Sequence, residues 1–158
     1  MLSRILVAVD ASAREPGVFD AAAQLAEEFR AALHVLRVIT ISPEFPAAGA
    51  GNPPDSLPAH LTNLALLELT ELWKRAPRLQ ATTPIVVLGQ PWKMILELAQ
   101  DLDADLIVIG SHGYQGWDHV LGTTASKVVN HADRNVFVVH ERATEATARS
   151  RALLRGSA

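Results

Sequence analysis

Five short apolar runs alternate with segments of helical apolar spacing, and this alternation restricts the fold more than any other feature of the chain. The runs predicted to be strands are Ile5–Val9, Leu33–Ile39, Ile85–Leu88, Leu106–Ile109 and Val136–Val139. Leu106–Ile109 contains no polar residue, which is typical of a parallel strand covered on both faces. Strands and helices that alternate in this way form an α/β fold, a doubly wound five-stranded parallel sheet with helices on both faces.

Four intervening segments carry apolar residues at spacings of three and four, as amphipathic helices do. These apolar positions are Val18, Ala21, Ala22, Leu25, Ala26 and Phe29 in the first segment, Leu61, Leu64, Ala65 and Leu72 in the second, Met94, Ile95, Leu98, Ala99 and Leu102 in the third, and Val128, Val129 and Ala132 in the fourth. Pro91 fits the first turn of the third helix. Pro84, which cannot donate to a sheet ladder, favours an edge position for the third strand.

The chain has the length and composition of one domain. It contains 158 residues, of which 49% are hydrophobic, and this is enough for a substantial core. We expect a single domain over residues 1–140, a mobile loop at 41–58 and a tail at 141–158. The loop is rich in Pro, Ala and Gly and follows the second strand, so it is either a lid over a ligand or a plain surface loop.

Charge and cysteine content exclude several classes of protein. The formal net charge is −3 without a basic tract, so neither nucleic acid nor an anionic membrane is an expected partner. The absence of cysteine excludes disulfides, iron–sulfur clusters and thiolate metal sites. No apolar run has the length of a signal peptide or a membrane span, so we expect no membrane insertion and a cytoplasmic protein.

The segment between Leu106 and Thr124 has the composition of a phosphate-binding loop. Gly110 ends the apolar run, and a residue without a side chain lets a ligand approach the backbone at the carboxyl end of a strand. Gly122, Thr123 and Thr124 precede a helical pattern, which puts hydroxyl groups at the cap and first turn. The free N–H groups of a helix N-terminus attract phosphate, although an ordinary capped helix has the same sequence signal.

This segment resembles the signature of the universal stress protein family: a glycine, two residues, a second glycine, a spacer and then Gly-Ser or Gly-Thr. The matching residues are Gly110, Gly113, Gly122 and Thr123. The spacer, Tyr114–Leu121, is one residue shorter than in the ATP-binding archetype of the family. The resemblance covers roughly residues 4–140. It implies the strand order 3-2-1-4-5 and a homodimer formed through the strand at 136–139.

The implied strand order makes the first and fourth strands neighbours, so a ligand crevice is expected between Asp10 and Gly110. In the family, the aspartate matching Asp10 contacts ribose or adenine; the alternative is that Asp10 only caps the following turn. Val38 resembles an adenine-contacting position, although its side chain also suits the core. His112 lies in the loop, where a phosphate contact is one possible role. The predicted nucleotide-binding residues are Asp10, Ala11, Ser12, Val38, Ile109, Gly110, His112, Gly113, Gly122, Thr123 and Thr124.

The resemblance implies an ATP-binding, nucleotide-dependent stress-response regulator with an unidentified regulatory protein partner. ADP and AMP are alternative ligands, and any Mg²⁺ is expected to arrive with the nucleotide, since no metal-ligand spacing is present. No residue of the two site segments is a convincing catalytic base or transition-state cation, so at most a slow ATPase is expected. The alternative function is a dimeric scaffold that binds no nucleotide and acts through protein contacts, which the shortened spacer favours.

Overall fold

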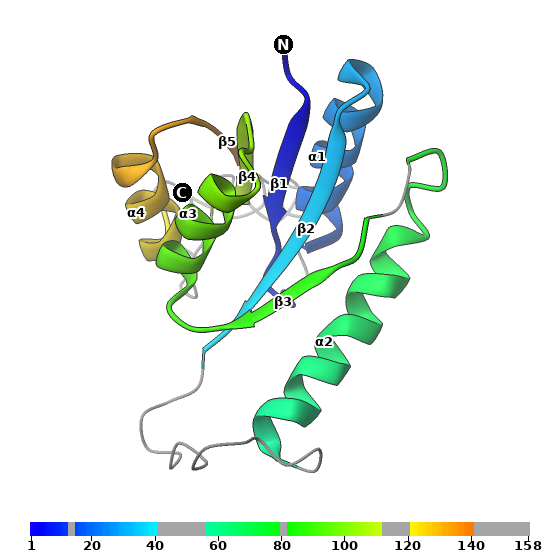
Figure 1. Ribbon diagram of the computed structural model, residues 1–158, viewed down its shortest axis with the longest axis vertical. Helices are drawn as coiled ribbons and strands as arrows, with labels where there is room; N and C mark the ends of the chain where they lie inside the picture. Colours follow the sequence, from blue (N-terminus) through cyan, green and yellow to red (C-terminus); the bar gives the residue numbers. More distant parts are fainter. Residues whose placement is uncertain (13–14, 41–55, 80–81, 112–120, 141–158) are drawn as a thin grey trace, which may run out of the picture.

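The computed structural model describes residues 1–12, 15–40, 56–79, 82–111 and 121–140. Its nine elements are β1 Arg4–Ala8, α1 Glu15–Phe29, β2 Ala32–Ile39, α2 Leu57–Trp73, β3 Ile85–Leu88, α3 Pro91–Asp101, β4 Leu106–Gly110, α4 Thr123–His131 and β5 Asn135–Val139. The five strands form one parallel sheet in the order β3-β2-β1-β4-β5 (Figure 1). The predicted fold class and strand order are therefore confirmed, and Pro84 directly precedes an edge strand as expected.

Two layers of helices cover the sheet, α1 and α2 on one face and α3 and α4 on the other. Alternate residues of β1 separate the two cores, because successive side chains of a strand point to opposite faces. Ile5 and Val7 pack with α1 and α2, whereas Leu6 packs with α3 and α4, and all three are fully buried. The central strands therefore carry the core, as in other α/β folds.

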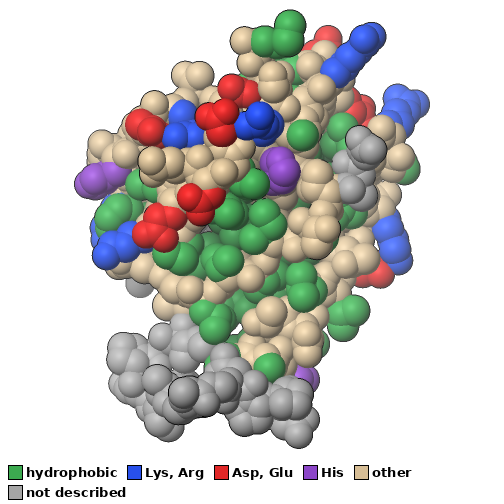
Figure 2. All heavy atoms as spheres, viewed as in Figure 1, with side chains coloured by type: hydrophobic (Ala, Val, Ile, Leu, Met, Phe, Trp, Pro, Cys, Tyr) green, Lys and Arg blue, Asp and Glu red, His purple; other side chains and the backbone are tan. Residues whose placement is uncertain are grey.

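The α3/α4 side of the sheet is less completely covered near the β3 edge. Figure 2 shows hydrophobic side chains gathered at the centre of this face, over β2 and β3. Val38, Ile85 and Val87 pack against the α3/α4 core but are only partly buried. No helix within the described ranges has both the length and the apolar content needed to cross a bilayer.

The second helix begins earlier than predicted. Ser56 is its N-cap, and the Ser56 hydroxyl accepts a hydrogen bond from the Ala59 N–H at 3.4 Å. Leu57 and Pro58 are therefore in the first helical turn, so the predicted loop at 41–58 was wrong at its carboxyl end. Proline suits this turn because its missing N–H would have had no partner within the helix. The rest of the predicted loop, residues 41–55, lies outside the described residues, as does the predicted tail at 141–158.

The predicted apolar faces of the helices were partly wrong. Phe29, Leu64 and Val129 were placed on buried faces by their spacing, but they are 54%, 44% and 43% exposed. Phe19, which the spacing left out, is fully buried and packs edge-on against Trp73 with ring centroids 5.7 Å apart. The buried face of α1 is therefore centred differently from the predicted one.

Asp105 connects the amino ends of β1 and β4. Its Oδ2 accepts hydrogen bonds from the N–H groups of Ser3 at 2.7 Å and Arg4 at 2.9 Å. These two backbone bonds hold the pKa of the Asp105 carboxyl below its ordinary value of 3.8. A carboxyl with a depressed folded-state pKa stabilises the fold above its unfolded-state pKa, and this contribution is lost as the pH falls through the folded-state value.

We expect Asp105→Asn to unfold at a lower temperature than the wild type at pH 7, because a neutral amide oxygen accepts these bonds more weakly than a carboxylate. The difference should shrink as the pH falls below 3.8, where the wild-type carboxyl becomes protonated too. Thermal unfolding followed by circular dichroism across this pH range measures both effects. Asp101→Asn, at the exposed end of α3, is the control. A constant difference at every pH would contradict the assignment.

Candidate functional site

The predicted site residues lie at the carboxyl ends of β1 and β4, which are neighbouring strands. Ala8 of β1 is in register with Ile109 of β4. These two strands are where the strand order reverses, because β1 leads to β2 on one side and β4 leads to β5 on the other (Figure 1). Doubly wound sheets bind ligands in the crevice at this point.

Asp10 follows β1 and organises the turn into α1. Its Oδ1 accepts a hydrogen bond from the Ser12 N–H at 3.2 Å, and the Ser12 carbonyl accepts one from the Glu15 N–H at 3.0 Å. Ala11 between them has φ +30°, a left-handed conformation that residues with a Cβ rarely adopt. Asp10 therefore does make the turn-capping hydrogen bond of the alternative interpretation. This bond uses one acceptor position of the Asp10 carboxylate, which is exposed and has several such positions.

Ser111 connects the end of β4 to both β5 and α4. It is buried, with 2% exposure; its N–H donates to the Val139 carbonyl at 2.9 Å, and its own carbonyl accepts from the Gly122 N–H at 2.8 Å. This bond brings the two predicted segments, one ending at Gly110 and the other beginning at Gly122, into direct contact. Ser111 was not among the predicted binding residues, and its position directly after Gly110 was the only signal for it.

Gly110 has a packing role that the sequence did not reveal. A Cβ at this position would lie 3.2 Å from Cγ2 of Val18 in α1. The absent side chain of Gly110 therefore faces the helix, and glycine allows α1 to pack closely against the end of β4. Close approach of a ligand to the Gly110 backbone stays a prediction.

The fourth helix begins at this edge. Gly122 is its N-cap, with φ −58° and ψ 157°, and this residue has no side chain that could cap the helix. The predicted hydroxyl cap was therefore wrong: Thr123 and Thr124 are the first residues of the helix itself. The first N–H groups of a helix have no partner within it and attract anions.

The positions of the remaining predicted residues say less about ligand binding. Val38 is half-buried on the α3/α4 face of β2, and Ile109 is 3% exposed in the same core. Both fit the alternative in which the side chain is core and only the backbone is available to a ligand. His112 and Gly113 lie outside the described residues.

Charged groups are arranged around this edge on both faces of the sheet. On the α1/α2 face, the buried Arg37 guanidinium donates hydrogen bonds to the carboxylates of Glu15 and Glu68. Burial raises the pKa of the Glu15 carboxyl above its ordinary value, and Arg37 opposes that rise. On the α3/α4 face, the Lys127 ammonium lies 5.5 Å from the centroid of the Trp92 ring. The described residues contain no group of three His, Asp or Glu side chains placed to hold a metal ion.

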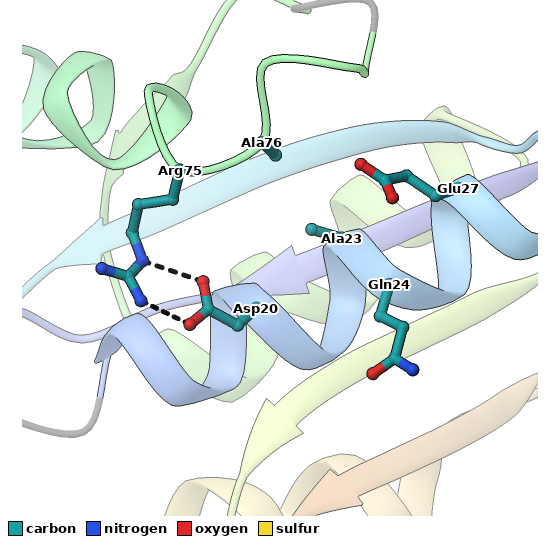
Figure 3. Close-up of a pocket in the computed structure, with 6 residues that line it drawn as sticks. All are labelled: Asp20, Ala23, Gln24, Glu27, Arg75 and Ala76. Carbon is teal, nitrogen blue, oxygen red and sulfur yellow. Dashed lines mark hydrogen bonds and ion pairs between the residues drawn. The ribbon is translucent and has the colours of Figure 1, made fainter.

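An open groove of about 460 Å³ lies elsewhere, between α1 and the segment after α2 (Figure 3). It is lined by Asp20, Ala23, Gln24, Glu27, Arg75 and Ala76. Arg75 and Asp20 close one end with two hydrogen bonds of 2.8 and 2.5 Å. Exposed ion pairs of this kind contribute little stability. None of the predicted nucleotide-binding residues lines this groove.

Two structural relatives of the fold have been solved with adenine nucleotides. A universal stress protein in complex with cAMP is 24% identical, with a TM-score of 0.65, and the match covers 88% of this chain and 97% of that one. The universal stress protein from Archaeoglobus fulgidus in complex with dAMP is 21% identical, with a TM-score of 0.61, and the match covers 87% and 98%. At these identities the likeness shows the fold.

The family itself is shown by sequence. Universal stress protein A homolog 1 from Coxiella burnetii is 36% identical over 140 residues, covering 85% of this chain and 94% of that relative. The sequence model of the Universal stress protein family matches residues 1–140, the same span as the predicted domain. The family-model match includes every element of the sheet described above. This chain therefore belongs to the universal stress protein family.

Proposed function

We propose that this protein binds ATP at the carboxyl edge of β1 and β4 and acts in the cytoplasm as a nucleotide-dependent stress-response regulator. The observation that carries the proposal is the hydrogen bond from the Gly122 N–H to the Ser111 carbonyl, 2.8 Å long. Through this bond the N-terminus of α4, whose cap residue has no side chain, lies directly beside the end of β4. An anion-attracting helix terminus at the switch point of a doubly wound sheet is suited to a phosphate chain.

The nucleotide complexes of two relatives support the same class of ligand. One universal stress protein was solved with cAMP and another with dAMP, and both share this fold over nearly nine-tenths of the present chain. Both ligands combine an adenine ring with a single phosphate group. A site that accepts this combination also accepts ATP if the two additional phosphates reach the first turn of α4. Thr123 and Thr124 supply hydroxyl groups there.

In this proposal, different site residues contact different parts of the nucleotide. The Asp10 carboxylate, exposed and with acceptor positions beyond the one that Ser12 occupies, accepts hydrogen bonds from a ribose hydroxyl or the adenine amino group. Val38 borders the base, and the phosphates lie at the N–H groups of Thr123 and Thr124. Mg²⁺ would come with the phosphates, since hard divalent cations bind chiefly through oxygen and water. Any hydrolysis is slow, because these residues provide no positioned base.

We also propose a homodimer that pairs β5 with its copy. This strand is at the edge of the sheet, and Phe137 on it is 45% exposed. An apolar edge strand left uncovered is prone to pair with another chain, and a symmetric dimer covers it. Binding at the Ser111 end of the site would then reach the interface through the Val139 carbonyl, which accepts the Ser111 N–H. An unidentified regulatory protein would respond to this change.

Calorimetric titration of ATP with Mg²⁺ into the folded protein tests the proposal, with AMP titrated in parallel. We expect a dissociation constant on the order of micromolar. Asp10→Ala should weaken both nucleotides by about tenfold, since it removes a charge-assisted hydrogen bond shared by the two ligands. Asp101→Asn, far from the site, is the control. Absence of binding by the folded wild type would reject the nucleotide proposal and leave the dimeric scaffold as the function.

A further inference from the structure

We propose that Arg37 is a positioning residue of the nucleotide site, which holds the Asp10–Ser12 turn in its binding conformation through Glu15. This inference rests on the proposed function, because it concerns the same site. It assigns a role to a buried ion network that neither the family signature nor the predicted binding residues include.

The network joins three elements at the carboxyl half of β2. Arg37 follows Leu36, whose carbonyl accepts the N–H of Val9 at 2.9 Å, so it lies beside the end of β1. The Arg37 side chain is 5% exposed. Its guanidinium donates to Glu15, the first residue of α1, and to Glu68 of α2. The Glu15 side chain is 14% exposed and that of Glu68 is 58% exposed, so the pair with Glu15 is the buried one.

Stability alone is a poor explanation for this arrangement. Removing an arginine and a glutamate from water carries a desolvation penalty that their mutual attraction seldom exceeds. Among the described residues, the buried Nε of Arg37 has no hydrogen-bond partner, which adds to the penalty. Apolar side chains would fill the same space at lower cost. An ion pair differs from an apolar contact in fixing the position and direction of its partners.

The partner that is fixed in this way is directly connected to the predicted site. The Glu15 N–H donates to the Ser12 carbonyl, and the Ser12 N–H donates to the Asp10 carboxylate. Glu15 is therefore held at both ends, by Arg37 through its side chain and by Ser12 through its backbone. Between Ser12 and Asp10 lies Ala11 at φ +30°, a conformation that persists only where the surroundings impose it. Arg37 supplies part of that constraint.

Charge gives Arg37 a second effect on the same turn. The Glu68 and Asp10 carboxylates both act to raise the pKa of Glu15, so each of them is close enough to repel the Glu15 carboxylate. Arg37 is the cation that opposes this repulsion. Without it, Glu15 and Asp10 would separate, and the turn would present its carboxylate in a different place to a nucleotide that is itself anionic.

Four variants separate positioning from a merely structural role. Arg37→Met and Glu15→Gln should each weaken binding of ATP with Mg²⁺ by about tenfold, the effect of losing one charge-assisted hydrogen bond. Arg37→Lys should recover part of the loss. Glu68→Gln removes a bond to the same guanidinium without touching the turn, so it should change affinity by less than about threefold. Titration calorimetry gives these ratios.

Thermal unfolding of the same proteins gives the second readout. Glu15→Gln and Glu68→Gln each weaken one of the two carboxylate contacts of the buried Arg37 guanidinium, so both should lower the unfolding temperature, whereas only Glu15→Gln should lower the affinity. A purely structural role would make the affinity follow the unfolding temperature in both variants. Wild-type affinity in Glu15→Gln would overturn the proposal, and this test holds even if Arg37→Met does not fold.

Hydrogen exchange distinguishes failure of this inference from failure of the proposed function. If the wild type binds no nucleotide, the exchange rates of the Ala11 and Ser12 amides still report the turn. Faster exchange in Arg37→Met and Glu15→Gln, with wild-type rates in Glu68→Gln, would uphold the positioning role alone. Unchanged exchange in all three would overturn it.

Discussion

Phe19→Ala is expected to lower the free energy of unfolding by about 3–5 kcal/mol, the cost of replacing a fully buried phenylalanine by alanine. Phe19 is 0% exposed, and its ring packs edge-on against Trp73, with the two ring planes at 82°. The substitution leaves a cavity between α1 and α2, the two helices that cover one face of the sheet. Urea unfolding followed by circular dichroism measures the loss.

Phe29→Ala is the matched control, because it makes the same chemical change in the same helix. Phe29 is the last residue of α1 and is 54% exposed, so its substitution should change the free energy of unfolding by no more than about 0.5 kcal/mol. Similar losses in the two variants would mean that the buried face of α1 is not the one described here.

This pair of phenylalanines shows what helical periodicity can and cannot predict. The spacing of apolar residues correctly identified a helix between β1 and β2, but two adjacent faces of that helix fit the same spacing. Which of the two faces is buried depends on contacts such as the one between Phe19 and Trp73. Trp73 belongs to α2 and is distant from Phe19 in the sequence. At the other end, the helix stops at Phe29 because Arg30 adopts φ +54°, so Phe29 has no further turn to pack against.

The same distinction explains the candidate site. Strand positions were predictable because each is a local apolar run, and the strand order followed from the family resemblance. The connection between the two glycine segments could be anticipated only as a motif, since it is made by a single backbone bond between Gly122 and Ser111. The Arg37 network was not predicted, because a lone arginine in an apolar strand shows nothing of the carboxylates that α1 and α2 bring to it.

Gly122→Val is expected to weaken binding of ATP with Mg²⁺ by at least about tenfold while the protein stays folded. Gly122 has φ −58°, which valine adopts without strain, and valine keeps the N–H that donates to the Ser111 carbonyl. Its branched side chain would stand beside the first N–H groups of α4, where the phosphates are proposed to lie. Valine is a poor N-cap, so a loss of stability of about 0.5–1 kcal/mol is expected as well.

Asn130→Val places the same side chain on the exposed surface of α4 near its carboxyl end, and it should leave the affinity unchanged. The graded variant Gly122→Ala should fall between the wild type and Gly122→Val, because a methyl group blocks less of the helix terminus. Calorimetry gives the affinities, and circular dichroism shows whether each variant is folded. If Gly122→Val binds ATP as tightly as the wild type, the phosphates do not lie at this helix, and a nucleotide bound through Asp10 alone would have its phosphates in solvent. Such a site would bind AMP and ATP equally, so the ratio of the two affinities in the wild type provides an independent check of where the phosphate chain lies.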